Sequence, residues 1–268
     1  MAEVKIIAEI GWNHMGDMNL AEKMIIAAKE SGADFAKFQT WQTKNLKPGE
    51  WDNDGRTEIY RKAELSKSDY SDLFEICKNN KIHFLTSLFN EKDYELISHL
   101  PIDTIKIPSP ENRNKKLIEF CDNNYKNIFL STGAATIDEI SESYKLFNKA
   151  KNVYLFHCVS RYPCEDQHIN LPRIDKLKEI TTNIGISDHS IDILSSLLSL
   201  NKGIKFIEKH FTIDKKLPGR DNAFAILPQD LKELSNTIKR YELMLESTSL
   251  ISNSDKDIRQ YYAGRWAK

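Results

Sequence analysis

The fold is decided by two neighbouring stretches, Ile184-Gly185-Ile186-Ser187-Asp188-His189-Ser190 and Phe206-Ile207-Glu208-Lys209-His210-Phe211-Thr212. Each stretch is short and strand-like, and an apolar, helix-like run over 191–200 separates them. Residues two apart in a strand share a face, so Ser187 and His189 share one face, as do Glu208 and His210. Burying imidazoles and a carboxylate is costly unless they bind something. Either histidine alone is better explained as a hydrogen-bonded core residue, but the set favours a metal or substrate site.

The composition excludes several classes of protein. The chain has 268 residues, of which 40% are hydrophobic, and its net charge is −1, so we expect no nucleic-acid partner and no anionic membrane surface. No apolar run approaches the length of a membrane span, and the first residues have the pattern of a buried strand rather than a signal peptide. The four cysteines fall in separate predicted elements with no C-x-x-C spacing, which predicts reduced thiols and a cytoplasmic location.

Strand-like runs alternate with helix-like runs along the whole chain. Strict alternation predicts parallel strands joined by right-handed crossovers. The predicted strands are Val4–Gly11, Phe35–Thr40, His83–Phe89, Thr104–Ser109, Asn127–Gly133, Asn152–Val159 and the two opening stretches. The predicted helices are Asn19–Ser31, Asp69–Asn80 after an N-cap at Ser68, Glu91–Leu100, Asn114–Asn123, Ile137–Ala150 after an N-cap at Thr136, Arg173–Thr181 and Gln229–Glu246.

Eight strand–helix units in about 250 residues match an α/β fold of the (β/α)₈ TIM-barrel type. An open, doubly wound sheet is the alternative, but it favours a G-x-G-x-x-G turn after the first strand, and Gly11-Trp12-Asn13-His14-Met15-Gly16 lacks that pattern. The polar, aromatic segment Trp41–Lys67 is too long for a plain connection and is predicted to be a functional loop. We expect a barrel over 1–248 and a linker-like tail over 249–268.

Polar residues cluster at the carboxyl ends of the predicted strands, where a barrel of this type carries its active site. Lys37 and Lys106 interrupt otherwise apolar strands. Two buried lysines near several hydroxyl groups suit a small, highly charged anion, such as a phosphate ester with a carboxylate. The polar set comprises Glu9, Asn13, His14, Lys37, Gln39, Lys106, Ser109, Glu111, Ser131, Thr132, His157, Ser160, Arg161, Tyr162, Ser187, Asp188, His189, Glu208 and His210.

Eight short motifs occur in order between Ala8 and about Asp221. They are Ala8-Glu9-Ile10-Gly11-x-Asn13-His14, Lys37-x-Gln39-Thr40, Lys106-Ile107-x-Ser109-x-Glu111, Ser131-Thr132-Gly133, His157-Cys158-x-Ser160-x-Tyr162-Pro163, Ser187-Asp188-His189, Glu208-Lys209-His210-Phe211 and Pro218-Gly219-x-Asp221. With these motifs the chain resembles the sialic acid synthase (N-acetylneuraminate synthase) family. That family condenses phosphoenolpyruvate with an N-acylated amino-hexose such as N-acetylmannosamine, forming a nine-carbon sugar acid and releasing phosphate.

The resemblance implies a role for each matching residue. His189 and His210 would hold a divalent cation (Mn²⁺, Mg²⁺ or Co²⁺) that polarises the aldehyde of the open-chain acceptor. Glu9 or Glu111 would stabilise the cationic intermediate or handle a proton of the attacking water. Phosphoenolpyruvate would lie against Lys37, Lys106, Ser109, Ser131 and Ser187. The amino-sugar acceptor would contact Glu9, Gln39, Glu111, Tyr162 and Asp221, and Ser160 joins the substrate-binding set.

The sequence also departs from the family pattern, mainly on the acceptor side, at Pro108-Ser109-Pro110 and at Pro218-Gly219-Arg220-Asp221-Asn222. Family members continue into an antifreeze-like domain that brings an arginine across a homodimer, and the resemblance here covers the barrel alone. Arg161 and Arg220 are the local candidates for that role, and we expect Arg220 to contribute to acceptor recognition. The alternatives are an octulosonate-type synthase, a metal-dependent aldolase, or a catalytically weak sugar-acid-binding barrel that needs a partner subunit.

Overall fold

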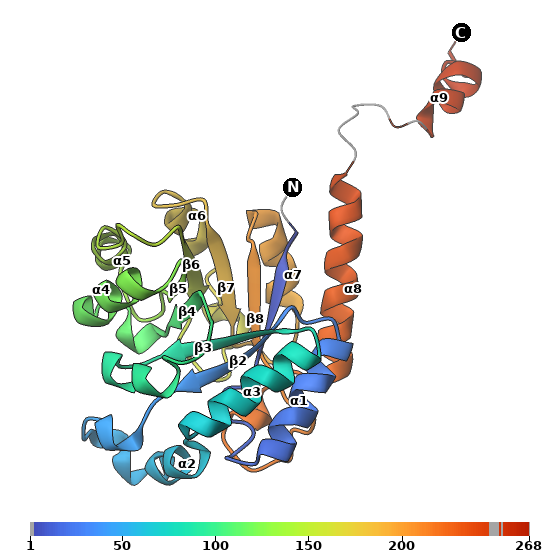
Figure 1. Ribbon diagram of the computed structural model, residues 1–268. Coiled ribbons are helices and arrows are strands. Elements are labelled where there is room, and N and C mark those ends of the chain that lie inside the picture. Colours follow the sequence, from blue (N-terminus) through green and yellow to red (C-terminus); the bar gives the residue numbers. More distant parts are fainter. Residues whose placement is uncertain (1–2, 247–251, 253, 268) are drawn as a thin grey trace.

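A closed barrel of parallel strands forms the centre of the computed structural model, which describes residues 3–246, 252 and 254–267 (Figure 1). The strands pair in chain order, and β1 closes the barrel by pairing with β8. This confirms the predicted (β/α)₈ barrel and excludes the open, doubly wound sheet, whose edge strands would not pair. The strands are β1 (Lys5–Glu9), β2 (Phe35–Thr40), β3 (His83–Leu88), β4 (Thr104–Ile107), β5 (Asn127–Ser131), β6 (Asn152–Cys158), β7 (Ile184–Asp188) and β8 (Phe206–His210).

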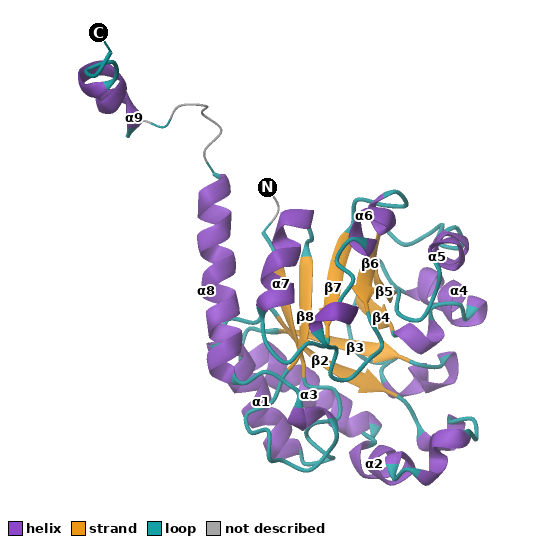
Figure 2. Ribbon diagram, turned by 180° about the vertical axis from the view of Figure 1, so that it is seen from behind, coloured by secondary structure: helices purple, strands orange, loops and turns teal. Residues whose placement is uncertain are grey.

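Helices surround the barrel and bury their apolar faces against its outer surface (Figure 2). They are α1 (Met18–Glu30), α2 (Arg56–Ala63), α3 (Lys67–Asn79), α4 (Lys115–Asn124), α5 (Ile137–Tyr144), α6 (Arg173–Lys178), α7 (Leu194–Ser199) and α8 (Pro228–Leu245). The segment between β2 and α3, expected to be a loop, contains α2 and two 3₁₀ turns. It therefore forms a small structured unit beside one side of the barrel mouth.

Tertiary contacts set the ends of several helices away from their predicted positions. Thr136 caps α5 as predicted, in a capping box with Glu139, but the helix ends at Tyr144 instead of Ala150. The Asp122 carboxylate accepts hydrogen bonds from the backbone N–H groups of residues 148, 149 and 150, which holds that segment outside the helix. Likewise α3 begins after Ser66, whose capping box with Asp69 replaces the predicted cap at Ser68.

The predicted helix over 91–100 forms only a 3₁₀ turn, Glu91–Leu96. Asp93 in this turn is buried, and its carboxylate accepts a 2.6 Å hydrogen bond from the Asn45 side chain of the segment after β2. This long-range contact, which lies outside any local pattern, anchors the turn to the barrel mouth. The predicted helix over 191–200 is also shortened, because α7 begins only at Leu194. The Asp192 carboxylate accepts a hydrogen bond from the backbone N–H of Leu194 at this start.

The barrel interior is filled in layers, and its lowest part is apolar. Aromatic rings from β2, β5, β6 and β8 pack together there, with ring centroids 4.7 Å apart for Phe129 and Phe206 and 5.0 Å apart for Phe129 and Phe156. Gly185 of β7 makes room for this packing, because a Cβ atom at that position would lie 2.8 Å from the Phe156 ring. We call this layer the aromatic floor; its members are Phe35, Phe129, Tyr154, Phe156 and Phe206.

A buried ion pair lies on the outer side of the barrel, between β7 and β8. Lys209 Nζ is 3.2 Å from Asp188 Oδ2, and the two side chains are 1% and 0% exposed. Asp188 also accepts hydrogen bonds from the Ser195 and Ser196 hydroxyl groups, at 2.5 and 2.6 Å. Lys209 donates to the backbone carbonyl oxygen of Ser190 at 2.7 Å. This network attaches α7 to the ends of the two strands that the sequence marks as functional.

Replacing Lys209 with Met should destabilise the barrel by about 3–5 kcal/mol, because Asp188 would remain as a buried charge without a counterion. Urea unfolding followed by circular dichroism measures the change. The Asp188→Asn/Lys209→Met double variant removes both charges and should lose less stability than the lysine variant alone. A single variant as stable as the unaltered protein would show that the pair contributes nothing.

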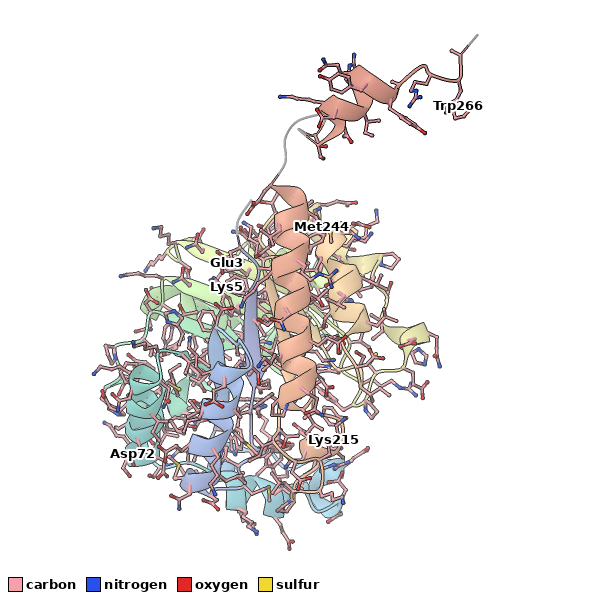
Figure 3. The ribbon with its side chains drawn as sticks, turned by 90° about the vertical axis from the view of Figure 1, so that its right-hand side faces the viewer. Glu3, Lys5, Asp72, Lys215, Met244 and Trp266 are labelled. Atoms are coloured by element: carbon pink, nitrogen blue, oxygen red, sulfur yellow. The ribbon has the colours of Figure 1, made fainter. Side chains whose placement is uncertain are left out.

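The C-terminal part of the chain follows α8. Met244 near the end of this helix is exposed, and the segment beyond carries α9 (Asp255–Asp257), a π-helical turn (Ile258–Tyr262) and the exposed Trp266 (Figure 3). The predicted boundary between barrel and tail at residues 248 and 249 lies outside the described residues. Among the residues that are described, no helix combines the length and the hydropathy needed to cross a membrane.

Candidate active site

Four charged side chains form a ring inside the barrel, directly above the aromatic floor. Lys37 Nζ lies 2.6 Å from Glu9 Oε2 and 3.8 Å from Glu208 Oε2, and Lys106 Nζ lies 2.5 Å from Glu208 Oε1. All four side chains are buried, and Lys106 Nζ is 4.9 Å from the centre of the Phe156 ring below. We call this set, Glu9, Lys37, Lys106 and Glu208, the charged ring. Its alternating signs allow four ionisable groups to be buried together.

The charged ring shifts the proton affinities of its members. Burial raises the pKa of Glu9, although Lys37 opposes this change. Burial alone would also raise the pKa of Glu208, but the Lys106 and Lys37 ammonium groups lower it below its ordinary value. Burial lowers the pKa of Lys106, and Glu208 opposes that change. Of the two carboxylates in the charged ring, Glu208 is thus the one held in its charged form, a role that the sequence motif alone did not assign to it.

Further hydrogen bonds connect the charged ring to neighbouring polar side chains. Lys106 also donates a 2.7 Å hydrogen bond to the Ser187 hydroxyl group, and Gln39 donates a 2.6 Å hydrogen bond to Glu9. Each ammonium group has three N–H donors, so both lysines can add an anionic ligand to their present partners. The structure therefore brings together the predicted residues Glu9, Lys37, Gln39, Lys106 and Ser187.

The two histidines lie above the ring, at the ends of β7 and β8. Their ring centroids are 5.4 Å apart. The half-exposed Tyr162 ring lies 4.1 Å from the His189 ring, and Phe224 lies 5.1 Å from the His210 ring. Asp221 Oδ2 is 3.5 Å from His210 Nδ1, and burial raises the pKa of Asp221 to about 7. We call His189 and His210 the histidine pair.

The donor atoms of the histidine pair fit a metal ion as a partial ligand set. His189 Nδ1 is bonded to the backbone carbonyl oxygen of Val159 at 2.7 Å, which fixes Nδ1 as the donor and leaves Nε2 as the nitrogen that a cation could bind. Burial alone would lower the pKa of His189, but the neighbouring Cys158 and the Val159 carbonyl raise it. Burial, together with the charge of His189, holds the pKa of His210 well below its ordinary value, so this imidazole is neutral. Within the described part of the chain, no three His, Cys, Asp or Glu side chains are arranged to hold a metal ion. Two imidazoles would leave most coordination positions to water and substrate.

Cys158 is a site residue that the sequence reasoning did not single out. It is buried, and its Sγ lies 3.3 Å from Ser109 Oγ. Burial alone would raise the pKa of the thiol, but His189, Ser109 and Lys106 lower it. The alternation of β6 was the available signal, because Phe156 and Cys158 share the face that points into the barrel.

The remaining predicted residues surround the same mouth. Ser109 and Ser160 both pack against the backbone of Gly133. Only glycine leaves room for them there, because a Cβ atom would lie 2.3 Å from Ser160 Oγ and 2.8 Å from Ser109 Oγ. Ser131 is buried at the end of β5, whereas Ser160 is exposed. Glu111 follows β4 and accepts a 2.7 Å hydrogen bond from Asn114.

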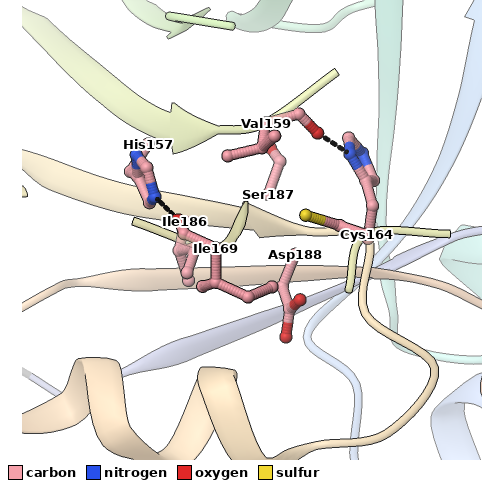
Figure 4. Close-up of a pocket in the computed structure, with 8 residues that line it drawn as sticks. His157, Val159, Cys164, Ile169, Ile186, Ser187 and Asp188 are labelled. Atoms are coloured by element: carbon pink, nitrogen blue, oxygen red, sulfur yellow. Dashed lines mark hydrogen bonds between the residues drawn. The ribbon is translucent and has the colours of Figure 1, made fainter. Parts of the chain in front are cut away.

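The sequence predicts that His157 and Asp188 belong to the polar residues of the mouth. This prediction is wrong, because both side chains lie on the outer side of the barrel. His157 Nε2 is bonded to the carbonyl oxygen of Ile169 at 2.8 Å in the layer between strands and helices (Figure 4). Figure 4 also shows Asp188 beside Ile169, while Ser187 lies on the other face of β7. The reason is the two-residue period of a strand, which turns each of these residues away from the neighbour that enters the barrel.

Arg161 and Arg220 make ion pairs at the surface. Arg220 is 46% exposed in its side chain, and its guanidinium group lies 3.0 Å from Asp54 of the segment after β2. Arg161 lies 3.8 Å from Glu165 in its own loop. The Arg220 contact joins the loop after β8 to the structured unit after β2. This ion pair does not test acceptor recognition, and the role of Arg220 in it stays a prediction.

A cavity of about 540 Å³ opens beside the charged ring, over the carboxyl ends of β2, β3 and β4. One wall is aromatic: Trp41 lies 5.8 Å from Tyr60 and 6.0 Å from Phe89, and Trp12 lies 4.9 Å from Tyr60, between ring centroids. The rest of the lining is mostly polar and comes from the segment after β2 and from the turns after β3 and β4. Gln39 of the lining bonds to Glu9, so the cavity borders the charged ring. We call it the aromatic slot.

Comparisons with known proteins define the class to which this site belongs. The profile of the NeuB family matches residues 24–249, and the chain belongs to that family. It is 34% identical over 258 residues to N,N'-diacetyllegionaminic acid synthase of Campylobacter jejuni, covering 90% of this chain and 77% of that protein. It is 34% identical over 274 residues to pseudaminic acid synthase of Helicobacter pylori, covering 97% of this chain and 81% of that protein.

A solved structure matches the whole fold. The sialic acid synthetase of Leptospira borgpetersenii, in complex with citrate, superposes with a TM-score of 0.89 at 31% identity. The match covers 99% of this chain and 93% of that chain. The family resemblance inferred from the eight motifs is thereby confirmed.

Proposed function

We propose that this chain condenses phosphoenolpyruvate with an N-acylated amino-hexose to give a nine-carbon, sialic-acid-like sugar acid and phosphate. The observation that carries the proposal is the charged ring beneath the histidine pair, at the mouth of a barrel from the NeuB family. The names of its relatives are those of synthases for legionaminic, pseudaminic and sialic acids. A cation site for the aldehyde and an anion site for phosphoenolpyruvate are what this condensation requires.

Phosphoenolpyruvate binds, in this proposal, at the charged ring. Lys37 and Lys106 donate to its phosphate and carboxylate, and these charge-assisted hydrogen bonds fix the enol carbon C3 toward the histidine pair. Ser187 already accepts from Lys106 and lies next to the ligand, while Ser109, in the turn after β4, and Ser131, at the end of β5, would reach it from the neighbouring strands. Glu208 keeps both ammonium groups in place from below.

The acceptor sugar lies above phosphoenolpyruvate, with its aldehyde at the histidine pair. His189 and His210 would hold a divalent cation (Mn²⁺, Mg²⁺ or Co²⁺), and such an ion supplies Lewis-acid polarisation of the aldehyde oxygen. Tyr162 limits the approach from the His189 side, where its ring covers the imidazole. Asp221 orients the acceptor through hydrogen bonds to its hydroxyl groups. A homodimer and a cytoplasmic location stay predictions.

The bonds change in two stages. C3 of phosphoenolpyruvate attacks the aldehyde carbon, so a carbon–carbon bond forms, the aldehyde oxygen takes a proton, and C2 becomes cationic. Water then adds to C2 and loses one proton, which balances the proton taken up by the aldehyde oxygen. The new C2 hydroxyl group then loses its second proton and becomes the C2 ketone as the bond from C2 to the phosphate oxygen breaks, and the released phosphate carries that proton. Glu9 and Glu111 are the candidates that stabilise the cationic carbon and take the proton of the water. The raised pKa of Glu9 suits proton exchange.

Phosphate release tests the proposal directly. The purified protein with Mn²⁺ and phosphoenolpyruvate should release phosphate only after an N-acylated hexosamine is added, and mass spectrometry should detect the nine-carbon acid. Arabinose 5-phosphate serves as the control acceptor for an octulosonate-type synthase. Release with that sugar alone would favour the alternative reaction, and no release with any acceptor would favour a sugar-acid-binding barrel.

A further inference from the structure

We propose that the aromatic slot receives a second N-acyl group, so that the acceptor is a di-N-acylated, unphosphorylated amino-hexose. This inference rests on the proposed function and specifies its acceptor. Gln39 and Glu111 are the members of its lining that the sequence motifs named, and its aromatic wall lies outside the named motif positions. Its position, its walls and its charge balance each support the assignment.

The position of the slot decides which part of the acceptor can reach it. The histidine pair that faces the aldehyde comes from β7 and β8, whereas the slot lies over β2, β3 and β4. In a barrel closed in chain order, these two groups of strands lie on opposite sides of the mouth. A six-carbon chain with its aldehyde at the histidine pair therefore extends its remote carbons toward the slot. The group received there is a substituent at the far end of the sugar, not the acyl group beside the aldehyde.

The walls of the slot fit an acylamino group better than a hydroxyl group. Four rings, those of Trp12, Trp41, Tyr60 and Phe89, form one continuous wall against which a methyl group and the C–H faces of the sugar can pack. The lining also contains the side-chain amides of Asn90 and Asn114. The Asn90 oxygen accepts from the N–H of Lys92 and the Asn114 amide donates to Glu111, and the remaining N–H donors and oxygen lone pairs of the two amides can pair with an acylamino group. An acylamino group has this same combination of an apolar end and a polar amide.

The charges of the slot oppose a phosphorylated acceptor. Its described lining contains three lysines, Lys47, Lys92 and Lys116, and three acidic residues, Glu91, Asp93 and Glu111, so the formal charges cancel. Lys116 is also paired with Glu91. No arginine belongs to this described lining, and arginine provides the bidentate geometry that phosphate recognition favours. The balanced formal charge of the lining therefore gives a phosphate group no net attraction, whereas a neutral acyl group needs none.

The test compares three acceptors in the presence of phosphoenolpyruvate and Mn²⁺. They are 2,4-diacetamido-2,4,6-trideoxymannose, N-acetylmannosamine and N-acetylmannosamine 6-phosphate. The unaltered protein should show a kcat/KM about 10- to 200-fold higher for the diacetamido sugar, the range that a filled apolar pocket provides. Trp41→Ala should bring the ratio between the diacetamido sugar and N-acetylmannosamine close to one, and Trp41→Phe should restore much of it.

Phe147→Ala is the matched control, because Phe147 is a half-buried aromatic residue far from the slot that packs against the outer core. It should preserve the ratio even if it lowers thermal stability as much as Trp41→Ala does. A preference of the unaltered protein for N-acetylmannosamine or its phosphate would overturn the inference and leave the proposed function intact. An unchanged ratio in Trp41→Ala would overturn it as well.

Calorimetric titration with the same sugars separates the two proposals. Tighter binding of the diacetamido sugar, lost in Trp41→Ala, supports the slot assignment even when no acceptor releases phosphate, in which case only the proposed condensation fails. Equal or absent binding of all three sugars, together with equal turnover, contradicts the slot assignment alone.

Discussion

Replacing His189 or His210 with Ala is expected to lower kcat/KM for the condensation by about 10³-fold or more, because Lewis-acid activation of an aldehyde contributes several kcal/mol. The Val159 carbonyl oxygen fixes the orientation of His189, and burial lowers the pKa of His210, so the first imidazole is oriented and the second is neutral for binding a cation. Each variant should also lose bound Mn²⁺, which electron paramagnetic resonance of the dialysed protein measures independently of turnover.

His157→Ala is the matched control for this experiment. His157 is a buried histidine of the neighbouring strand, but it faces the helix layer and is bonded to Ile169. Its loss should lower thermal stability while Mn²⁺ binding and turnover remain. The assignment of the histidine pair fails if the double His189→Ala/His210→Ala variant retains full activity after treatment with a chelator.

Replacing Lys106 with Met should raise the apparent constant for phosphoenolpyruvate by about 10- to 100-fold, the effect of losing one charge-assisted hydrogen bond, and should change the constant for the acceptor much less. Lys106 lies within the charged ring, below the level of the histidine pair, where the anion is expected. Glu208 would keep Lys37 as a counterion, at 3.8 Å, so the barrel should still fold. Steady-state kinetics with each substrate varied in turn measures both constants.

Lys209→Met provides the comparison. It also removes a buried lysine from a barrel strand, but its ion pair with Asp188 faces outward. It should reduce stability without a selective effect on phosphoenolpyruvate. If Lys106→Met instead raised mainly the constant for the acceptor, Lys106 would belong to the sugar site.

The order of strands could be predicted from the sequence because each barrel strand follows local rules. Short apolar runs alternate with helical runs, which predicts parallel strands in chain order, and the eight strand–helix units match the closed barrel that the structure shows. Helix ends could not be predicted equally well. The end of α5 depends on Asp122 of the preceding helix, and the turn at Asp93 depends on Asn45, which lies 48 residues earlier.

The candidate site, like the fold, could be predicted where a local sequence pattern determines it and not where a long-range contact does. The two-residue period places Ser187 with His189 and Glu208 with His210, and the same period, applied to β6, would have turned His157 outward and Cys158 inward. The pairing of Lys106 with Glu208 joins residues 102 positions apart, which no local pattern encodes. The aromatic slot depends on how residues 41–66 fold against the barrel, and that segment has no regular period.

The aromatic floor has a kinetic consequence for a reaction of two substrates. Because packed rings close the barrel below the charged ring in the described part of the chain, we expect both substrates to enter, and both products to leave, through the opening that the histidine pair borders. With phosphoenolpyruvate at the ring and the sugar above it, the sugar would block the way to the deeper position. Productive turnover then has a compulsory sequence, with phosphoenolpyruvate adding before the sugar, and a sugar that arrives first acts as a competitive obstruction at high concentration.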